Sequence, residues 1–591
     1  MGNVLLPLTM YIRPVRIRFC LTILSLFALV SSKAQTPWIE PNSWADLLLQ
    51  INETQPHFSA KDRGPAWFSY TNRYLLRGDI DSIFQRQKEA DTMMQILLYI
   101  PTAAEFNGRW MLNDNAEFVS PERRYMAESR KPILKGLYAY KSLFYNYREG
   151  NSTLSLNPIL NLQAGPSSQW GHTAVQNTRG AEIRGTFGNA VGFYTRVLEN
   201  QWFAPNYVRE WGDSLGVAPG VGWWRNTDST GFDYFSVKGY ISTTVVKNHI
   251  RAAFGHDRLF IGNGYRSLIL SDFAKEYLFL RLNTRIGPFQ YQNIFAQLHN
   301  RQPSPGTLPG NTLLPKKYMA VHRASVTIRN WLEIGATEMI VFDRDSLGDG
   351  GFEAQYLNPV IYYRAVESNQ GSRDNAMVAL DAKAYVLKKG ILYGQLLIDE
   401  FRVSEIRAGK GWWANKFGLQ TGAKTTLNIK HGLLFLQVER NVVKPYTYSH
   451  YRSSQDWSNY GQPLAHPLGA NFREVFFRAV YQPGRYARWR LALMYMRANK
   501  GMDSSYYGGP NYGGNIYKSN DSRIGDYNIA VLQGNQAQIS HLRFEANYML
   551  RHNLYLELAY QKRSQTGFRP SDGNWLQVGL RLNTEALGTL Y

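Results

Sequence analysis

Aromatic and basic side chains occur together in four polar stretches of this 591-residue chain. An aromatic face stacks on the C–H surface of a pyranose ring, and a cation donates charge-assisted hydrogen bonds to sugar hydroxyls or carboxylates. The pattern therefore predicts polysaccharide contact, with these candidates: Trp211, Trp223, Trp224, Arg225, Arg407, Lys410, Trp412, Trp413, Tyr446, Tyr448, His450, Arg452, Trp457, Tyr506, Tyr507 and Tyr512. The alternative is that many of these residues pack within folded loops or mark the ends of membrane strands, where Trp and Tyr also collect.

Trp412 and Trp413 differ from the other candidates because they lie mid-stretch beside two cations, Arg407 and Lys410. We expect this pair to bind rather than to pack. A basic surface of this kind could equally neutralise lipopolysaccharide phosphates, and the sequence leaves both uses open.

Catalytic and metal-binding patterns are weak. His256, Asp257 and Ser267 are close in sequence, but no nucleophile elbow or triad spacing accompanies them. An acidic stretch, Asp343, Asp345, Asp349 and Glu353, has Leu347 at the fifth loop position, where calcium needs an oxygen ligand. The sequence therefore predicts no enzyme, no metal and no cofactor.

The first 34 residues have the pattern of a secretory signal peptide. Three arginines precede the apolar run FCLTILSLFALV, and a small-residue site follows, with cleavage expected after Ala34. The single cysteine, Cys20, lies inside this segment, so the mature chain is predicted to contain no thiol.

The chain is strongly basic. Its formal charge of +21 falls by four, to about +17, if the predicted signal peptide is removed. A basic exported protein suits acidic polysaccharide, lipopolysaccharide or outer-membrane lipid, and nucleic acid is not an expected partner.

Residues 35–150 are predicted to form a helical region at the periplasmic side or inside the barrel. Trp44, Leu47, Leu48 and Ile51 recur at helical spacing behind Asn42 and Ser43, and residues 79–100 continue the helical character.

Residues 151–591 instead alternate with a period of two, as in LRFEANYML and WLQVGLRL. Two kinds of connection alternate along this region. Short turns are predicted near residues 188, 247, 287, 330, 389, 431, 483 and 552. Long connections are predicted at 165–177, 202–232, 261–275, 300–316, 343–375, 403–414, 444–471, 498–538 and 564–573. This wiring predicts an all-β transmembrane barrel of about eighteen antiparallel strands, with short periplasmic turns, long extracellular loops and periplasmic termini.

Individual strands support this prediction. In YLFLRLNTRI, Leu278, Leu280 and Leu282 share the expected lipid face, and Arg281, Asn283 and Arg285 share the lumen face. The next strand changes phase at Gln292–Asn293, where we expect a bulge. The glycine-containing stretch IGNGYRSLILSDFA (261–274) lacks the spacing and the strand-to-helix context of a phosphate loop, so it is predicted to be an extracellular loop.

Four stretches carry a resemblance to a known family: GHDRLFIGNGYRSLILSDFA, YLNPVIYYRAVE, QPLAHPLGANFRE and YGGPNYGGNIYKS. They resemble the Wzi-like capsule-assembly outer-membrane proteins, in particular a branch resembling the RemB-type gliding-motility proteins. The resemblance implies an eighteen-stranded barrel closed at the periplasmic side by N-terminal helices. It also implies a lectin-like role in holding capsular polysaccharide at the cell surface.

Three functions from different classes follow as hypotheses. The first is an anchor for capsular or exopolysaccharide. The second is a scaffold for gliding motility or surface-protein secretion, with surface or secretion-machinery proteins as partners. The third is a diffusion channel, because an eighteen-stranded barrel is wide enough to enclose water.

Overall fold

The computed structural model describes residue 40, residues 43–54 and 103–118, and the chain from 124 to 584 with short gaps at 126, 135, 169–172, 189, 228–230, 248, 301–313, 330, 344–351, 361, 371–373, 388–389 and 506–507. The predicted signal peptide, the helical stretch predicted at 79–100 and the last seven residues lie outside the described residues.

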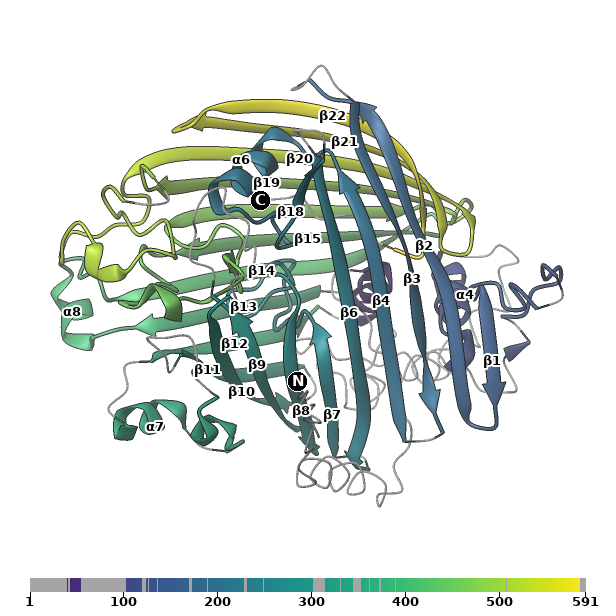
Figure 1. Cartoon of the computed structure of the whole chain (residues 1–591), viewed down its shortest axis with the longest axis horizontal. Coiled ribbons are helices and arrows are strands. Elements are labelled where there is room, and N and C mark those ends of the chain that lie inside the picture. The colour runs from purple at the N-terminus through teal and green to yellow at the C-terminus, as the bar shows by residue number, and fades with distance from the viewer. Residues whose placement is uncertain are drawn as a thin grey trace, which may run out of the picture.

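A single antiparallel sheet closes on itself (Figure 1). The described residues contribute eighteen strands to the ring: β2 (Ser152–Pro166), β3 (Thr173–Phe187), β4 (Val191–Trp202), β6 (Gly231–Val246), β7 (Ile250–Asp257), β8 (Tyr277–Ile286), β9 (Phe289–His299), β10 (Lys316–Ile328), β11 (Leu332–Phe342), β12 (Asn375–Val386), β13 (Gly390–Glu400), β14 (Lys416–Ile429), β15 (Gly432–Val443), β18 (Phe472–Gln482), β19 (Trp489–Met502), β20 (Asn535–Arg551), β21 (Leu554–Gly567) and β22 (Ser571–Leu582). β22 pairs with β2 from Leu160↔Leu582 to Ala164↔Val578, which closes the barrel. The predicted fold class is confirmed.

Two short strands extend this sheet outside the ring. β1 (Tyr145–Glu149) pairs with the start of β2, and β5 (Arg225–Thr227) pairs with the start of β6. Because β1 follows directly from the turn-rich residues 124–144, it links the N-terminal region to the barrel wall.

The eight predicted short turns all fall between consecutive strands. Two connections predicted to be long are short, because β2 ends at Pro166 and β22 begins at Ser571. Residues 564–567 carry small and polar side chains that resemble a loop, yet they continue the ladder with β20 and leave only 568–570 as the turn.

The two faces of the wall are inverted relative to a soluble sheet. On β8, Leu278 is 39% exposed whereas Arg281 on the other face is 2% exposed. Apolar residues therefore face outward and polar residues face the lumen, which is the pattern of a membrane barrel.

The bulge predicted at Gln292–Asn293 is wrong. β9 keeps continuous register with both neighbours, with Gln292 paired to Asn283 and Asn293 paired to Leu282. The phase change arises because Asn293 faces outward beneath a covering segment, to which its Nδ2 donates a hydrogen bond at the carbonyl of Pro359 (3.0 Å).

Two helices occupy the short-turn end of the lumen. α2 (Trp44–Glu53) and α4 (Ala103–Asp114) pack an apolar cluster against inward-facing residues of β15, β18 and β19. The backbone N–H of Ala103 also donates to the carbonyl of His431 in the turn between β14 and β15 (3.0 Å). Among the described helices, none has the length and apolar character needed to cross a bilayer.

Polar contacts fix α2 in place. Lys383 Nζ donates to Glu53 Oε1 (2.9 Å), Tyr385 hydroxyl donates to the same carboxylate, and Lys424 Nζ lies 3.7 Å from Glu53 Oε2. Although burial alone raises the pKa of Glu53, the two lysines bring it below its ordinary value. The carboxylate is therefore held in its charged form.

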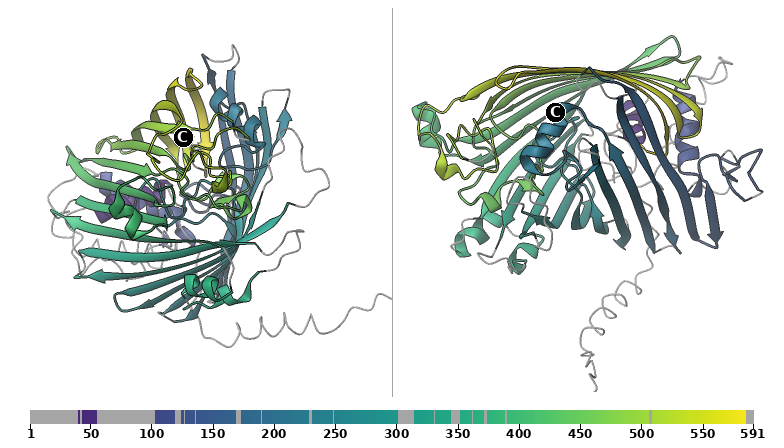
Figure 2. Two further views of the ribbon diagram at one scale, coloured as in Figure 1. Left: turned by 90° about the vertical axis from the view of Figure 1, so that its left-hand side faces the viewer. Right: turned by 45° about the horizontal axis from the view of Figure 1, so that its top comes forward.

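The other end of the lumen is filled by two long connections, as Figure 2 shows with segments lying inside the ring of strands. Leu268, Ile269 and Leu270, in the connection between β7 and β8, are fully buried. The predicted place of this stretch between two strands is confirmed, and the structure adds that the stretch is buried inside the ring. It folds inward because the wall there carries apolar lumen residues, among them Met319, Val341 and Met496.

Polar residues of the wall bind the backbone of the same inward connection. Gln395 Oε1 accepts from Leu268 N (2.8 Å), and Glu439 accepts from Tyr265 N and Arg266 N (2.9 and 3.2 Å). These bonds pair three backbone N–H groups that burial would otherwise leave without water.

Candidate functional site

Helix α6 (Asn206–Leu215) lies in the mouth of the barrel on the long-connection side (Figure 1). Pro205 precedes it with a fixed φ of −56°, and Gly216 ends it in the left-handed conformation with a φ of 63°. At Gly212 a Cβ would lie 2.9 Å from the Phe232 ring, so only glycine allows this close approach to the wall.

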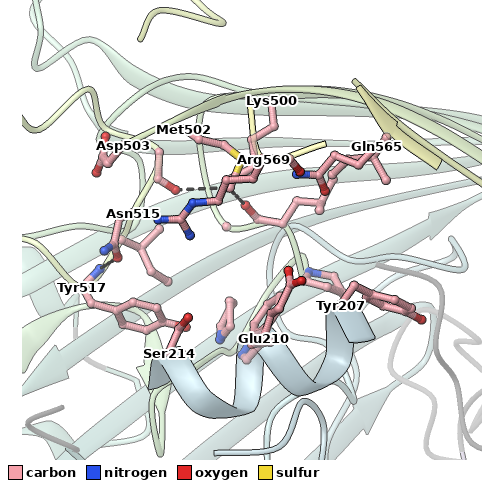
Figure 3. A pocket seen from close by; sticks show the side chains of 18 of the residues that line it. Tyr207, Glu210, Ser214, Lys500, Met502, Asp503, Asn515, Tyr517, Gln565 and Arg569 are labelled. Atoms are coloured by element: carbon pink, nitrogen blue, oxygen red, sulfur yellow. Dashed lines mark hydrogen bonds between the residues drawn. The ribbon is translucent and has the colours of Figure 1, made fainter. Parts of the chain in front are cut away.

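A cavity of about 150 Å³ separates α6 from the wall formed by β19, β20 and β21. Figure 3 shows Tyr207, Glu210 and Ser214 on α6 along one side, and Lys500, Met502, Gln565 and Arg569 on the other. The connection between β15 and β18 also lines the cavity, through Pro467, Leu468 and Gly469.

Arg563 is the buried cation of the cavity. Its guanidinium lies 4.3 Å from the centre of the Tyr207 ring, and Nη2 donates to Gln565 Oε1 (3.0 Å). Tyr207 also packs edge-on to His541 and close to Trp575 of the wall. The cation–π contact therefore fixes both the helix and the arginine head group.

Lys500 has a structural role in the cavity wall. Its ammonium donates to the carbonyls of Leu468, Ala470 (3.3 Å) and Gly514 (3.1 Å). These three bonds use all three donors of the lysine and tie the inserted connection to the loop between β19 and β20.

Asp503 is the buried carboxyl of the cavity. Burial raises its pKa above the ordinary value, although Tyr512 N donates to Oδ1 (2.7 Å) and Lys518 Nζ lies 3.7 Å from Oδ2. The atom Oδ2 is buried, so Asp503 orders the surrounding loop between β19 and β20 at the edge of the cavity.

The remaining polar groups of the cavity reach solvent. Arg569 and Glu210 are exposed, Trp211 and Asn515 are half-buried, and Arg569 Nη2 donates to the carbonyl of Ser504 (3.2 Å). Aromatic faces, an exposed guanidinium, amides and carboxyls thus converge on one concave surface. This set of groups suits a hydroxyl-rich and partly acidic ligand.

Of the sixteen predicted polysaccharide-binding residues, Trp211 lines this cavity. Its ring also packs edge-on to Phe273 (5.9 Å between centroids). Trp223 and Arg225 lie farther along the same connection, with the guanidinium 5.6 Å from the indole.

Trp412 and Trp413 form a second, separate pair in the connection between β13 and β14. Their ring centres are 6.2 Å apart. The cations over them are Arg402, 4.8 Å from Trp412, and Arg523, 4.1 Å from Trp413. Arg407 and Lys410, the expected neighbours, are exposed on and beside α8 (Val403–Ala408).

Five predicted residues are buried: Trp224, Tyr446, Tyr448, His450 and Trp457. Tyr448 hydroxyl donates to the carbonyl of Leu268 (2.8 Å), and Trp457 Nε1 donates to the carbonyl of Ile269 (2.9 Å). These two side chains connect the β15–β18 connection to the β7–β8 connection. Their role is therefore packing within folded loops rather than contact with a ligand. Arg452 is exposed, Tyr512 is half-buried, and Tyr506 and Tyr507 lie outside the described residues.

The sequence pattern does not predict Arg563, Gln565, Arg569, Lys500 or Asp503. The first two are alternate residues of β21 that point into the lumen, and such an inward polar residue looks like any other in an alternating strand. Only the folding of α6 over β21 distinguishes them.

The weak catalytic and metal patterns do not assemble among the described residues. His256 bonds to the carbonyl of Val237, Asp257 pairs with Lys238 (3.1 Å), and Ser267 donates to the carbonyl of Ile261. The described residues contain no metal-binding group of three or more His, Cys, Asp or Glu, and positions 344–351 of the acidic stretch lie outside them.

No family model matches the sequence, and no curated protein matches it. Among solved structures, the chain is similar to Wzi, described as an outer-membrane protein involved in group 1 capsule assembly in Escherichia coli and a carbohydrate-binding β-barrel. The two share 12% identity and a TM-score of 0.45 over 72% of this chain and 85% of that chain.

The chain is also similar to OccK8 (OprE) of Pseudomonas aeruginosa, with 10% identity and a TM-score of 0.39 over 73% of this chain and 99% of that chain. A BenF-like porin from Pseudomonas fluorescens gives 7% identity and a TM-score of 0.39 over 74% and 99%. Likenesses at these levels assign no ligand or activity to this chain, and the barrel fold rests on the strand pairing itself.

Proposed function

We propose that this protein is an outer-membrane barrel that binds acidic capsular or exopolysaccharide at its long-connection mouth and retains it at the cell surface. The observation that carries the proposal is the cavity between α6 and β19–β21, where aromatic, amide and guanidinium groups converge above a filled lumen. The resemblance of four sequence stretches to Wzi-like proteins implied the same ligand class.

An extended polymer contacts more than one surface, and Trp412–Trp413 is the second surface that we assign to it. The loop between β19 and β20 joins both places: Asn515 and Tyr517 line the cavity, and Asp526 O accepts a hydrogen bond from Trp413 N (2.9 Å). One chain that spans both contacts gains affinity through effective concentration, without any new contact.

The orientation follows from the same proposal. The long-connection side faces the cell exterior, the short turns and the termini face the periplasm, and α2 and α4 close the periplasmic end.

A diffusion channel is less well supported. Among the described residues, the mouth half of the lumen holds an apolar core with Leu270, Tyr448 and Trp457, and the other half holds α2 and α4. A porin of this strand number keeps an aqueous passage that this packing would block.

The remaining alternative is a scaffold for gliding motility or surface-protein secretion. It predicts that deletion changes motility or secretion while polysaccharide stays on the cells.

The discriminating experiment measures polysaccharide released into the medium against polysaccharide retained on cells, in a strain that lacks this protein. We expect the released fraction to rise while total synthesis is unchanged, and wild-type protein to restore retention. Complementation with Arg569→Ala should restore it only in part, whereas Arg485→Ala, an exposed arginine in the short turn between β18 and β19, should restore it fully. Unchanged retention together with altered motility or secretion would favour the scaffold instead.

A further inference from the structure

The connection between β11 and β12 folds over the outside of the barrel. Its described part between residues 352 and 370, which we call the strap, contains the short helix η5 (Ala354–Leu357) and helix α7 (Tyr363–Gln370). Figure 1 shows α7 outside the ring of strands, beside β10 and β11.

Beneath the strap, the lipid-facing wall carries three polar side chains in one row. Asn293 of β9 pairs with His322 of β10, and His322 pairs with Glu338 of β11. Apolar outward residues flank the row on both sides: Leu282 of β8 pairs with Asn293, and Val378 of β12 pairs with Glu338. Left uncovered, these polar groups would face hydrocarbon without a hydrogen-bond partner, which is strongly unfavourable.

The strap pairs each of the three. Tyr363 N and Arg364 N donate to the two oxygens of Glu338 (2.9 and 3.0 Å), the Tyr363 hydroxyl bonds His322 Nε2, and Asn293 donates to the carbonyl of Pro359 (3.0 Å). The strap is thus built into the wall by hydrogen bonds at the level of the polar row.

An apolar cluster holds the strap between this row and the mouth. Tyr356, Tyr363 and Val366 pack on outward residues of the wall, including Phe295 and Ile340. Glu338 lies four residues along β11 from Phe342, which is at the mouth end of the strand. At about 3.4 Å per residue, the polar row is therefore roughly 14 Å below the mouth. The strap therefore occupies a layer that lipid occupies around the neighbouring strands.

The strap also exposes three large apolar side chains, next to the exposed polar residues Gln355, Asn358 and Arg364. Val360 is 81% exposed, Tyr362 is 57% exposed and Leu357 is 46% exposed. They continue the exposed apolar face of the wall, which includes Ile334 of β11 and Leu380 of β12.

We propose that the strap is a membrane-embedded segment, in which Leu357, Val360 and Tyr362 contact the acyl chains of the lipid leaflet on the mouth side of the barrel. The proposal rests on the transmembrane barrel and is independent of the polysaccharide site. It gives this connection a lipid partner, whereas the connections between β7 and β8 and between β15 and β18 fold into the lumen.

The test uses nitroxide labels on the full chain in lipid vesicles. In a Cys20→Ser background, Val360→Cys is compared with Leu380→Cys on the lipid-facing wall and with Ser404→Cys on the exposed helix α8. The heat-dependent electrophoretic shift of each labelled protein verifies that the barrel is folded.

We expect the label at 360 to collide with oxygen in preference to a water-soluble nickel chelate, with a ratio close to that at 380 and several-fold above that at 404. A ratio like that at 404 would place the strap in water and overturn the proposal. Low collision with both reagents would mean that protein, such as a second copy of this chain, covers the strap, and would overturn it equally.

Discussion

At the scale of single residues, the chemistry of the mouth depends on a few groups with different roles. Arg563 and Lys500 are held by protein contacts, whereas Arg569 and Glu210 keep their head groups in solvent. The solvent-facing groups are therefore the ones that the proposed polysaccharide would meet first.

Trp412→Ala is predicted to weaken binding of the acidic polysaccharide about three- to tenfold, because an aromatic contact contributes roughly 0.5–1.5 kcal/mol. Calorimetric titration of the purified barrel measures the change. The control is Trp331→Ala, an exposed tryptophan in the short turn between β10 and β11, and it should leave the affinity unchanged. An equal loss in both variants would remove Trp412 from the binding surface.

His450 makes the inserted connection between β15 and β18 sensitive to acid. Burial lowers its pKa to about 4, below the value of about 6.5 in an unfolded chain. Because the unfolded state binds the proton more readily, stability is complete above about pH 6.5 and is lost as the pH falls toward 4, by about 2–3 kcal/mol.

The His450→Gln variant should lose this dependence between pH 6.5 and 4, as measured by denaturant unfolding at a series of pH values. His249→Gln, at an exposed short turn, serves as the matched control and should keep the wild-type profile. A wild-type slope in His450→Gln would assign the acid sensitivity to another group.

At the scale of elements, the strands and short turns could be predicted from sequence, and the inserted connections could not. Period-two alternation is local, so Leu278 and Arg281 already reveal which face meets lipid. The stretch 261–274 contains apolar and polar residues in a pattern that fits an exposed loop. Its burial depends on apolar lumen residues of distant strands, such as Met339 and Met496, which no local pattern connects to it.

The same limit applies to the candidate site. Aromatic stretches could be recognised in the sequence, but full burial of Tyr448 and Trp457 and only partial burial of Trp412 depend on which loops enter the lumen. The cavity itself forms only where α6 crosses β21, two elements separated by more than 300 residues.

The anchoring of α2 gives a prediction at this scale. Glu53→Gln removes the carboxylate shared by the buried Lys383 and Lys424, of which Lys383 keeps Glu333 at 3.4 Å, and should destabilise the docked helix by about 3–5 kcal/mol. Limited proteolysis of the folded barrel should then release the N-terminal segment much faster than in wild type. Glu149→Gln, at an exposed strand end, should not change the rate, and an unchanged rate in Glu53→Gln would show that α2 is held by its apolar face alone.

At the scale of the whole molecule, the barrel is a filled cylinder with a polar, aromatic rim. Filling of the lumen from both ends predicts that the protein in a planar bilayer gives no steady ohmic pore, whereas an open diffusion porin reconstituted in the same way does. A stable, voltage-independent conductance would show that the inserted connections leave a passage, and would revive the channel alternative.

Net basic charge acts on the same scale. A chain of formal charge +21, or about +17 without the predicted signal peptide, attracts a polyanion over distances limited by the Debye length, about 8 Å at physiological ionic strength. The affinity for acidic polysaccharide should therefore fall as salt is raised, while the contribution of the aromatic contacts persists.

The central claim is that the cavity beside α6 holds the polysaccharide, and equilibrium binding of the host's own acidic polysaccharide to the purified barrel tests it most directly. We predict saturable binding that Arg569→Ala weakens about tenfold, the equivalent of one charge-assisted hydrogen bond of roughly 1.5 kcal/mol, and that Arg485→Ala leaves unchanged. Absence of binding to the wild-type barrel, or equal affinities for wild type and Arg569→Ala, would contradict the account.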